Sequence, residues 1–232
     1  MADYVLVHGA WHGAWCWKRI LPGLWQAGHR AFAVTLTGVG ERAHLLQTPI
    51  TLQTHVEDVC RVIEAEELDS AVLVGHSYAG MVVTGVADRL PEHIGQLVYL
   101  DAVVPGPGES WSSGHSPETR EQRRAQIAAQ GVLPPADPVA FGLRGEDAAW
   151  VARRMTPQPG GVYDSPLDFD AARVFGRPKT FIDCTDPALP TIAASRRRVR
   201  SESGWQVVEI ATGHDPMISA PEALLRALLA LA

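Results

Sequence analysis

Residues 72 to 80 read Val-Leu-Val-Gly-His-Ser-Tyr-Ala-Gly, an apolar run that leads directly into a serine among small residues. A buried strand, a sharp turn with a central serine and a following helix are typical of a nucleophile elbow. The usual pattern is G-x-S-x-G, whereas here the fifth position is Ala79 and the glycine follows as Gly80. We predict that Ser77 is a nucleophile exposed at the start of a helix.

Short apolar runs that alternate with helical patterns extend this unit in both directions. Their continuous apolar character favours parallel strands covered on both faces. Right-handed crossovers then restrict the chain to a doubly wound sheet with its site at the carboxyl ends of the strands. We predict an α/β fold with a six-stranded, mostly parallel sheet. The predicted strands are residues 4–7, 31–36, 71–74, 96–100, 179–184 and 206–210.

The alternation of strands and helices is interrupted over residues 105–177, which are rich in proline, glycine and charge. Helical patches over 117–130 and 137–155 predict a small helical cap, inserted before the penultimate strand and lying over the strand ends. The chain is then one structural domain, with a core of residues 1–104 and 178–232 and the cap between them. Near the C-terminus, Ser219-Ala220-Pro221-Glu222 has the spacing of a capping box that begins a closing helix.

Composition narrows the class of protein. A chain of 232 residues with 46% hydrophobic content can bury the core of a single domain. The net charge of -6, from 26 acidic and 20 basic residues, leaves no basic face for nucleic acid. We interpret the run Arg-Arg-Arg-Val-Arg at 196–200 as the solvated side of a short helix and not as an anion site.

Cys16, Cys60 and Cys184 are odd in number and far apart, which favours reduced core thiols over a zinc site or a disulfide framework. The sequence contains no run of roughly 18 apolar residues, the length that a membrane span requires. We therefore expect a cytoplasmic protein without a membrane partner. We consider a homodimer as the oligomeric state of this protein.

A serine hydroxyl needs a base to become a nucleophile at neutral pH. In this kind of fold the chain order is serine, acid, histidine, so the base is expected in the loop after the last strand. Of the nine histidines, His214 alone combines that order with that position. We predict that His214 accepts the proton of Ser77.

The acid that orients this histidine has two main candidates. Asp186 follows the strand 179–184, which is the usual place, and Asp101 ends the strand 96–100, a place that some hydrolases of this fold use. We favour Asp186 and keep Asp101 as the alternative. Asp183, within its strand, is a third candidate, and Asp215 is too close to His214 along the chain to reach its ring.

The first strand ends in a glycine-bearing turn, Val-His-Gly-Ala-Trp-His-Gly at residues 7–13. The backbone N–H of Ala10, or alternatively that of Trp11, would form an oxyanion hole with the N–H of Tyr78. His8 and His12 lie on either side of this loop, and we do not expect them to bind a metal. The candidate pocket residues are Trp11, His12, Tyr78, Trp111, Phe141 and Trp150.

Three segments, residues 7–17, 75–80 and 213–214, resemble the plant esterase and hydroxynitrile lyase group of the α/β-hydrolase superfamily, which includes salicylate methylesterase-like proteins and bacterial relatives. The resemblance spans nearly the whole chain except the cap. It implies the α/β-hydrolase fold, Ser77 and His214 as nucleophile and base, and an acid after the penultimate strand, in agreement with Asp186. This chain has one intervening residue fewer before that acid than the family usually has.

The lyases of this group have a threonine in the first-strand turn and a lysine directly after the histidine, where this chain has Ala10 and Asp215. Without that cation to stabilise a departing anion, ester hydrolysis is favoured. We predict a serine esterase that acts, without metal or organic cofactor, on small to medium esters with an apolar or aromatic part, including methyl esters. The alternatives are a lyase or carbon–carbon hydrolase that uses the same serine and histidine without acylation, and a small-molecule receptor without turnover.

Overall fold

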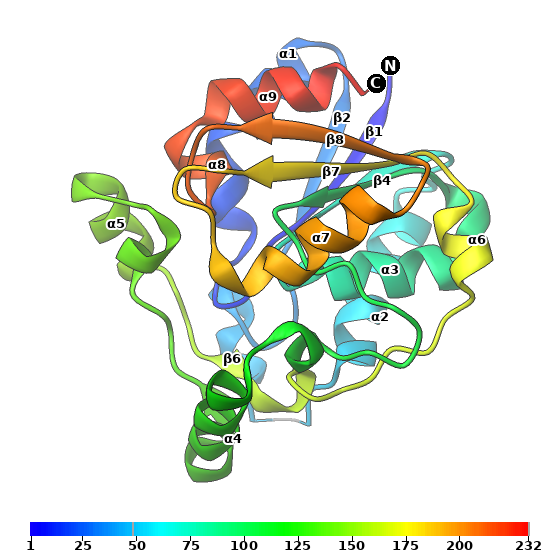
Figure 1. The fold of residues 1–232 in the computed structure, drawn as a ribbon. Coiled ribbons are helices and arrows are strands. Elements are labelled where there is room, and N and C mark those ends of the chain that lie inside the picture. The colour runs from blue at the N-terminus through cyan, green and yellow to red at the C-terminus, as the bar shows by residue number, and fades with distance from the viewer. Residues whose placement is uncertain (48, 232) are drawn as a thin grey trace.

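The computed structural model describes residues 1–47 and 49–231. Six strands form one sheet in the order β2-β1-β3-β4-β7-β8, and every pairing within it is parallel. This arrangement, shown in Figure 1, confirms the predicted α/β fold. The strands are β1 (Asp3–Val7), β2 (Arg30–Val34), β3 (Ala71–His76), β4 (Ile94–Leu100), β7 (Lys179–Cys184) and β8 (Trp205–Ile210).

The strand limits differ from the predicted ones by no more than two residues, and the early end of β2 has a local cause. β2 ends at Val34, although the apolar run continues to Leu36. The N–H of Leu36 donates to Nε2 of His8 (3.1 Å), and the hydroxyl of Thr35 accepts from the N–H of Ala14 (2.8 Å). The polar groups of these residues therefore hold the turn that follows β1 and do not extend the sheet.

Helices cover both faces of the sheet. α1 and α9 pack together on one face, and α2 packs against α3 on the other (Figure 1). The helices of the core are α1 (Leu21–Gln26), α2 (Leu52–Ala65), α3 (Ala79–Arg89), α7 (Ala193–Ser201), α8 (Pro216–Ser219) and α9 (Pro221–Leu229). Short 3₁₀ helices occur at η1 (Ala14–Arg19), η2 (Gly40–Leu45), η3 (Pro91–His93) and η7 (Pro190–Ile192).

The predicted capping box before the closing helix is wrong. Ala220 is the N-cap of α9, and no side chain caps the helix. The Ser219 hydroxyl instead lies 2.7 Å from the Thr212 hydroxyl and donates to the carbonyl of Asp215 (3.1 Å). Ser219, the last residue of α8, thus binds back to the loop that carries His214.

Residues 105–177, which we continue to call the cap, join β4 to β7. They contain α4 (Pro117–Gln130), α5 (Gly145–Ala152) and α6 (Ala171–Phe175), with the antiparallel pair β5 (Val132–Leu133) and β6 (Gln158–Pro159), and the 3₁₀ turns η4 (Trp111–Gly114), η5 (Pro138–Phe141) and η6 (Gly160–Val162). In Figure 1, α4 and α5 lie beyond the carboxyl ends of the strands, whereas α6 returns to pack on α3. The division into core and cap stays a prediction.

The cap helices match the sequence pattern unequally. α4 has the predicted limits, but the patch over 137–155 is divided into η5 and α5. The break follows Gly142, which has a φ of 86°. A Cβ atom on Gly142 would stand only 2.9 Å from the Cα of Gly213. Close contact with the His214 loop therefore ends the first helical segment.

The three cysteines are buried and free, as predicted for reduced core thiols. Within the part of the chain that the structure describes, no helix is both long enough and apolar enough to cross a membrane.

Candidate active site

The turn at Ser77, between β3 and α3, has a strained backbone. Ser77 has a φ of 56°, in the left-handed region that residues other than glycine rarely adopt. Its N–H donates to the carbonyl of Leu100 (3.1 Å), and its carbonyl accepts from the N–H of Val103 (3.0 Å). The chain that leaves β4 therefore maintains the strain and fixes the direction of the hydroxyl.

Two glycines explain the departure from the usual serine motif. A Cβ on Gly75 would stand 2.7 Å from the carbonyl oxygen of Ala79, and one on Gly80 would overlap the carbonyl oxygen of Val103. The methyl group of Ala79, in contrast, is accommodated in the core. A glycine is needed at position 80 because α3 presses that residue against the chain beyond β4.

His214 lies in the loop between β8 and α8, and its ring reaches the serine. Nε2 of His214 is 2.8 Å from Oγ of Ser77, and the histidine is only 3% exposed. Its backbone N–H donates to the carbonyl of Phe141 in the cap (2.9 Å). The structure thus brings together the two residues that the motif and the chain order predict.

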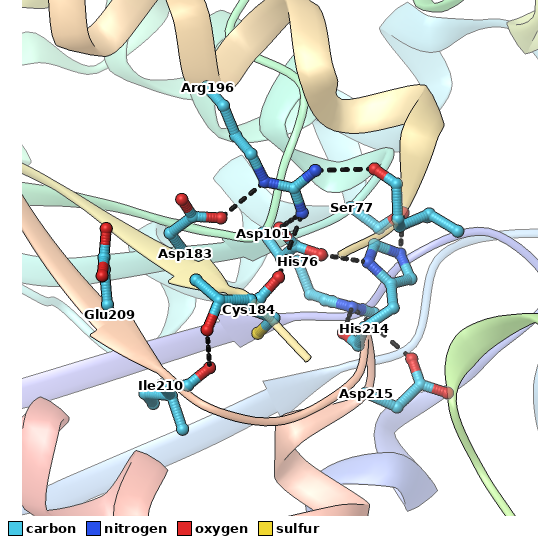
Figure 2. Close-up of polar contacts among 12 residues, drawn as sticks. His76, Ser77, Asp101, Asp183, Cys184, Arg196, Glu209, Ile210, His214 and Asp215 are labelled. Atoms are coloured by element: carbon cyan, nitrogen blue, oxygen red, sulfur yellow. Dashed lines mark hydrogen bonds and ion pairs between the residues drawn. The ribbon is translucent and has the colours of Figure 1, made fainter. Parts of the chain in front are cut away.

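Asp101 completes the hydrogen-bonded chain. Its Oδ2 lies 2.6 Å from Nδ1 of His214, and the residue is fully buried with a φ of 41°. Because His76 pairs with Leu100 in the register of β3 and β4, Ser77 and Asp101 are the next residues along two neighbouring strands. Figure 2 shows the ring of His214 between them. With Nδ1–H donated to Asp101, Nε2 is free to accept the serine proton.

The prediction that Asp186 orients the histidine is wrong. Asp186 is exposed, and its N–H donates to the carbonyl of Thr212 (3.0 Å). β7 is one strand further from Ser77 than β4, and Asp186 lies two residues beyond its end. The shortened spacing after Cys184 was the sequence signal for this difference, and the alternative, Asp101, contacts His214 instead.

Arg196 is the residue that sequence reasoning missed. Its Nη2 donates to Oδ1 of Asp101 and its Nε to Oδ1 of Asp183, both at 2.5 Å, and its side chain is 13% exposed (Figure 2). The interpretation of 196–200 as a solvated face is therefore wrong for this residue. Asp183, the third candidate acid, is also bound by Arg200 (2.7 Å). Asp101 and Asp183 lie side by side at the ends of β4 and β7, and their two negative charges need a cation, which α7 supplies as Arg196.

A second buried carboxylate, Asp215, faces two histidines. Oδ2 of Asp215 lies 3.3 Å from Nε2 of His12, and Oδ1 lies 3.5 Å from Nε2 of His76. Nδ1 of His12 lies 2.7 Å from the carbonyl of Ala10. Since both nitrogens of His12 face acceptors, the protonated ring satisfies both. Asp215 therefore joins the turn after β1 to the His214 loop.

Electrostatics agree with an ion pair between His12 and Asp215. Burial alone would lower the pKa of His12, but the Asp215 carboxylate and the Ala10 carbonyl raise it. Burial alone would raise the pKa of Asp215, but His12, with His76 and His214, lowers it to about 2. The buried charges thus stabilise each other.

His76 supports the backbone of the base. Its Nε2–H donates to the carbonyl of His214 (2.8 Å), and the two rings lie 4.6 Å apart. Burial, followed by the charge of His214, holds the pKa of His76 well below its usual range, so the ring is neutral. Ligand atoms of His76, His214 and Asp215 lie within 4.8 Å of one another, but a metal there would displace the hydrogen bonds of His214.

The turn after β1 decides between the two predicted oxyanion donors. The N–H of Trp11 donates to Oε1 of Gln158 in the cap (2.9 Å), so it is occupied. Within residues 1–47 and 49–231, the N–H groups of Ala10 and Tyr78 meet no acceptor. Ala10 and Tyr78 are therefore the pair available to a developing oxyanion.

The cap binds Trp11 through all of its polar groups. Besides the bond to Gln158, the carbonyl of Trp11 accepts from the N–H of Thr156 (3.0 Å), and its indole Nε1–H donates to the carbonyl of Leu133 (3.1 Å). Trp11 has a φ of 66°, a conformation that these contacts hold in place. The shape of the oxyanion turn thus depends on the cap.

Aromatic rings form a wall beside the serine and histidine. Phe141 lies 5.5 Å from the ring of His214 and 6.1 Å from that of Trp11. Trp111 lies 4.9 Å from the ring of Tyr78 and 6.0 Å from that of Trp11. We call Trp11, Tyr78, Trp111 and Phe141 the aromatic wall.

The other two predicted pocket residues have different surroundings. Trp150 packs edge-on against Trp15 (5.1 Å) and under the guanidinium of Arg154 (4.8 Å). The ring of His12 stacks on the opposite partner, the indole of Trp15, at 5.2 Å. The two ring nitrogens of His12 face the carbonyl of Ala10 and the carboxylate of Asp215. We therefore leave Trp150 and His12 out of the aromatic wall.

Residues 4–227 match the model of the alpha/beta hydrolase family. The chain belongs to this family. It is 42% identical to the carbendazim hydrolyzing esterase of Nocardioides sp. (strain SG-4G) over the whole length of both chains. It is also 26% identical to the putative methylesterase 14 of Arabidopsis thaliana, over 99% of this chain and 71% of the relative.

A solved structure shares the fold. The extracellular alpha/beta-hydrolase from a Paenibacillus species, described as homologous to tobacco salicylic acid binding protein 2, superposes with a TM-score of 0.85 at 20% identity, over 99% of this chain and 98% of that one. These similarities confirm the predicted fold and the resemblance to the methylesterase group.

Proposed function

We propose that this protein hydrolyses small to medium carboxylic esters through an acyl intermediate on Ser77. The observation that carries the proposal is the unbroken hydrogen-bonded chain from Asp101 Oδ2 through His214 to Ser77 Oγ, with distances of 2.6 and 2.8 Å. Full-length similarity to an esterase confirms the predicted class, a carboxylic ester hydrolase.

Acylation uses each group of the site once. As Oγ of Ser77 bonds to the ester carbonyl carbon, its proton passes to Nε2 of His214. The carbonyl oxygen becomes negative and accepts hydrogen bonds from the N–H groups of Ala10 and Tyr78. Asp101 stabilises the imidazolium, which then gives its proton to the leaving alcohol oxygen as the carbon–oxygen bond breaks.

Deacylation repeats these steps with water. His214 takes a proton from a water molecule as its oxygen attacks the acyl carbon, and returns that proton to Ser77 when the acid leaves. Arg196 does not touch the reacting atoms. It is a positioning residue, because its guanidinium holds Oδ1 of Asp101 while Oδ2 faces His214 (Figure 2).

The aromatic wall supports substrates with an apolar or aromatic part, including methyl esters. Tyr78, a member of the wall, directly follows Ser77 and packs on Trp111. Phe141, another member, packs on the base His214, so the wall borders the reacting carbonyl. Because the Nocardioides relative is a carbendazim hydrolyzing esterase, carbendazim is a further compound to assay.

The test is a panel of p-nitrophenyl and methyl esters with the wild type and Ser77→Ala. We expect kcat/KM to fall about 10⁵-fold or more, since the loss of a serine nucleophile has effects of that order. Ser203→Ala, on an exposed residue, is the matched control and should retain full activity. Equal activity in Ser77→Ala would contradict the proposal.

Mass spectrometry of an acid-quenched reaction separates the proposal from its rivals. An acyl adduct on the peptide that contains Ser77 is expected. Turnover without an adduct under conditions of slow deacylation would favour a lyase or a carbon–carbon hydrolase. Tight ligand binding without turnover, unaffected by Ser77→Ala, would favour a receptor.

The cytoplasmic location is part of the same proposal. Three buried cysteines without disulfides support it, because structural disulfides are characteristic of oxidising compartments. The homodimer stays a prediction.

A further inference from the structure

We propose that the side-chain amide of Gln158 binds substrate by donating a hydrogen bond to a second acceptor atom close to the scissile carbonyl. The inference rests on the proposed function and narrows its substrate class. It assigns to the cap a polar group that selects among esters.

Gln158 is buried at the start of β6 and only half of its amide is used. It is 1% exposed, and its Oε1 accepts from the N–H of Trp11 (2.9 Å). Its Nε2 is also buried, and no acceptor for it exists within residues 1–47 and 49–231. Buried amide donors are nearly always paired in folded proteins, so an unpaired donor at this position indicates a partner that binds from outside the chain.

The direction of the free donor is fixed by Trp11. A reversed amide would place the NH₂ group of Gln158 against the N–H of Trp11, donor against donor. Oε1 must therefore face Trp11, and Nε2 faces away from it. A flip of the Gln158 amide, with its oxygen and nitrogen interchanged, therefore does not supply a partner for Nε2.

Gln158 is joined to the oxyanion turn by one hydrogen bond. Trp11, which its Oε1 contacts, directly follows Ala10, and the N–H of Ala10 is one of the two donors available to the oxyanion. An ester carbonyl bound by Ala10 and Tyr78 would thus have the amide of Gln158 beside it. An acceptor one or two bonds from the carbonyl carbon is at a suitable separation.

Arg123, on α4, has one unpaired N–H group at the same wall. Its guanidinium carbon lies 5.7 Å from the ring of Trp11 and 5.1 Å from that of Trp111, and its Nη1 is buried without a partner among the described residues. The nearby acid Asp164 is occupied by Arg124 (2.9 and 3.0 Å). This side of the wall therefore offers two unpaired N–H groups, on Gln158 and Arg123.

These groups together define a class of substrate. The aromatic wall suits a planar ring, and the unpaired donors suit an oxygen or nitrogen acceptor on it. We infer that preferred substrates are heteroaromatic esters with a ring acceptor ortho to the ester group. An ester of the same shape without that acceptor leaves Gln158 unpaired and is disfavoured.

The experiment compares methyl picolinate with methyl isonicotinate. The ring nitrogen is ortho to the ester in the first and para in the second, so size and shape are matched. The ratio of their kcat/KM values is divided by the ratio of their alkaline hydrolysis rates, which removes intrinsic reactivity. For the wild type we expect a corrected ratio of about ten in favour of methyl picolinate.

Two variants separate binding from a structural role. Gln158→Glu retains an oxygen for the N–H of Trp11 but, when ionised, has no donor, whereas Gln158→Met loses both groups. We expect both to reduce the corrected ratio to about one. Gln122→Met, on an exposed glutamine of α4, is the matched control and should keep the wild-type ratio.

A wild-type ratio near one, or a ratio that Gln158→Glu leaves unchanged, would overturn the inference. So would a loss confined to Gln158→Met, which would show that Gln158 acts through Trp11 alone. In each case, p-nitrophenyl acetate hydrolysis that depends on Ser77 would leave the proposed function intact. Only the absence of such hydrolysis with every ester would count against the function itself.

Discussion

Two buried carboxylates flank the catalytic loop, and their charges are balanced in different ways. Asp101 accepts from His214 and from the guanidinium of Arg196, which stays charged at every accessible pH. Asp215 faces the neutral ring of His76 and the ring of His12, and the charge of His12 depends on pH. The comparison indicates that the charge of Asp101 is balanced by a permanent cation, whereas the contact between the turn after β1 and the His214 loop depends on pH.

The largest effect is expected on the Asp101 side. Asp101→Asn should lower kcat by about 10³- to 10⁴-fold, because an amide facing Nδ1 favours the wrong tautomer of His214. The measurement is steady-state hydrolysis of p-nitrophenyl acetate, with circular dichroism to verify folding. A loss below tenfold would show that His214 does not rely on this carboxylate.

Removal of the permanent cation should mainly affect stability. Arg196→Met leaves the buried Asp101 and Asp183 without their shared partner, and we expect a loss of about 3–5 kcal/mol in the free energy of unfolding. Urea denaturation measures it, and Arg197→Met, on the exposed neighbour, is the control. Equal losses of stability in Arg196→Met and Arg197→Met would contradict the proposal that Arg196 balances the charges of Asp101 and Asp183.

The Asp215 side should make stability depend on pH. The folded pKa of His12 is raised above 6.5, so its contribution is complete below that pH and is lost as pH rises through the folded pKa. The pKa of Asp215 is lowered from 3.8 to about 2, so its contribution is complete above pH 3.8 and is lost as pH falls towards 2.

Asp215→Asn should therefore remove roughly 2 kcal/mol of stability near pH 6. The difference from the wild type should shrink towards both higher and lower pH. Urea denaturation from pH 4 to pH 9 tests this, with Asp186→Asn as the exposed control. Parallel stability curves for the wild type and Asp215→Asn would show that His12 and Asp215 do not form an ion pair.

The smallest effect is expected at Asp186. Because this residue is exposed and its side chain does not contact His214, Asp186→Asn should change kcat/KM by less than about twofold and stability by less than about 0.5 kcal/mol. The same ester assay and urea denaturation are sufficient. A large loss of activity would restore Asp186 as the acid.

Sequence reasoning succeeded where the signal is local. The apolar run 179–184 has the limits of β7, and the patch 117–130 has those of α4, because burial and helix capping act within each segment. Ser77 and His214 were found since a short motif and the order along the chain identify them.

The failures involve contacts between segments. The choice of Asp101 depends on β4 being the neighbour of β3 and on the register that aligns His76 with Leu100. Arg196 lies in a run of arginines, and only the position of α7 over two strand ends shows which one turns inward. Neither fact is present in the sequence of a single element.

The three hydrogen bonds between the cap and Trp11 restrict how new specificity can arise. A cap transplanted from a relative would have to reproduce two acceptors and one donor at the positions that this tryptophan requires. A chimera that lacks them would lose the conformation of the catalytic turn together with the former selectivity. Single replacements inside the native segment are therefore the safer route for laboratory evolution.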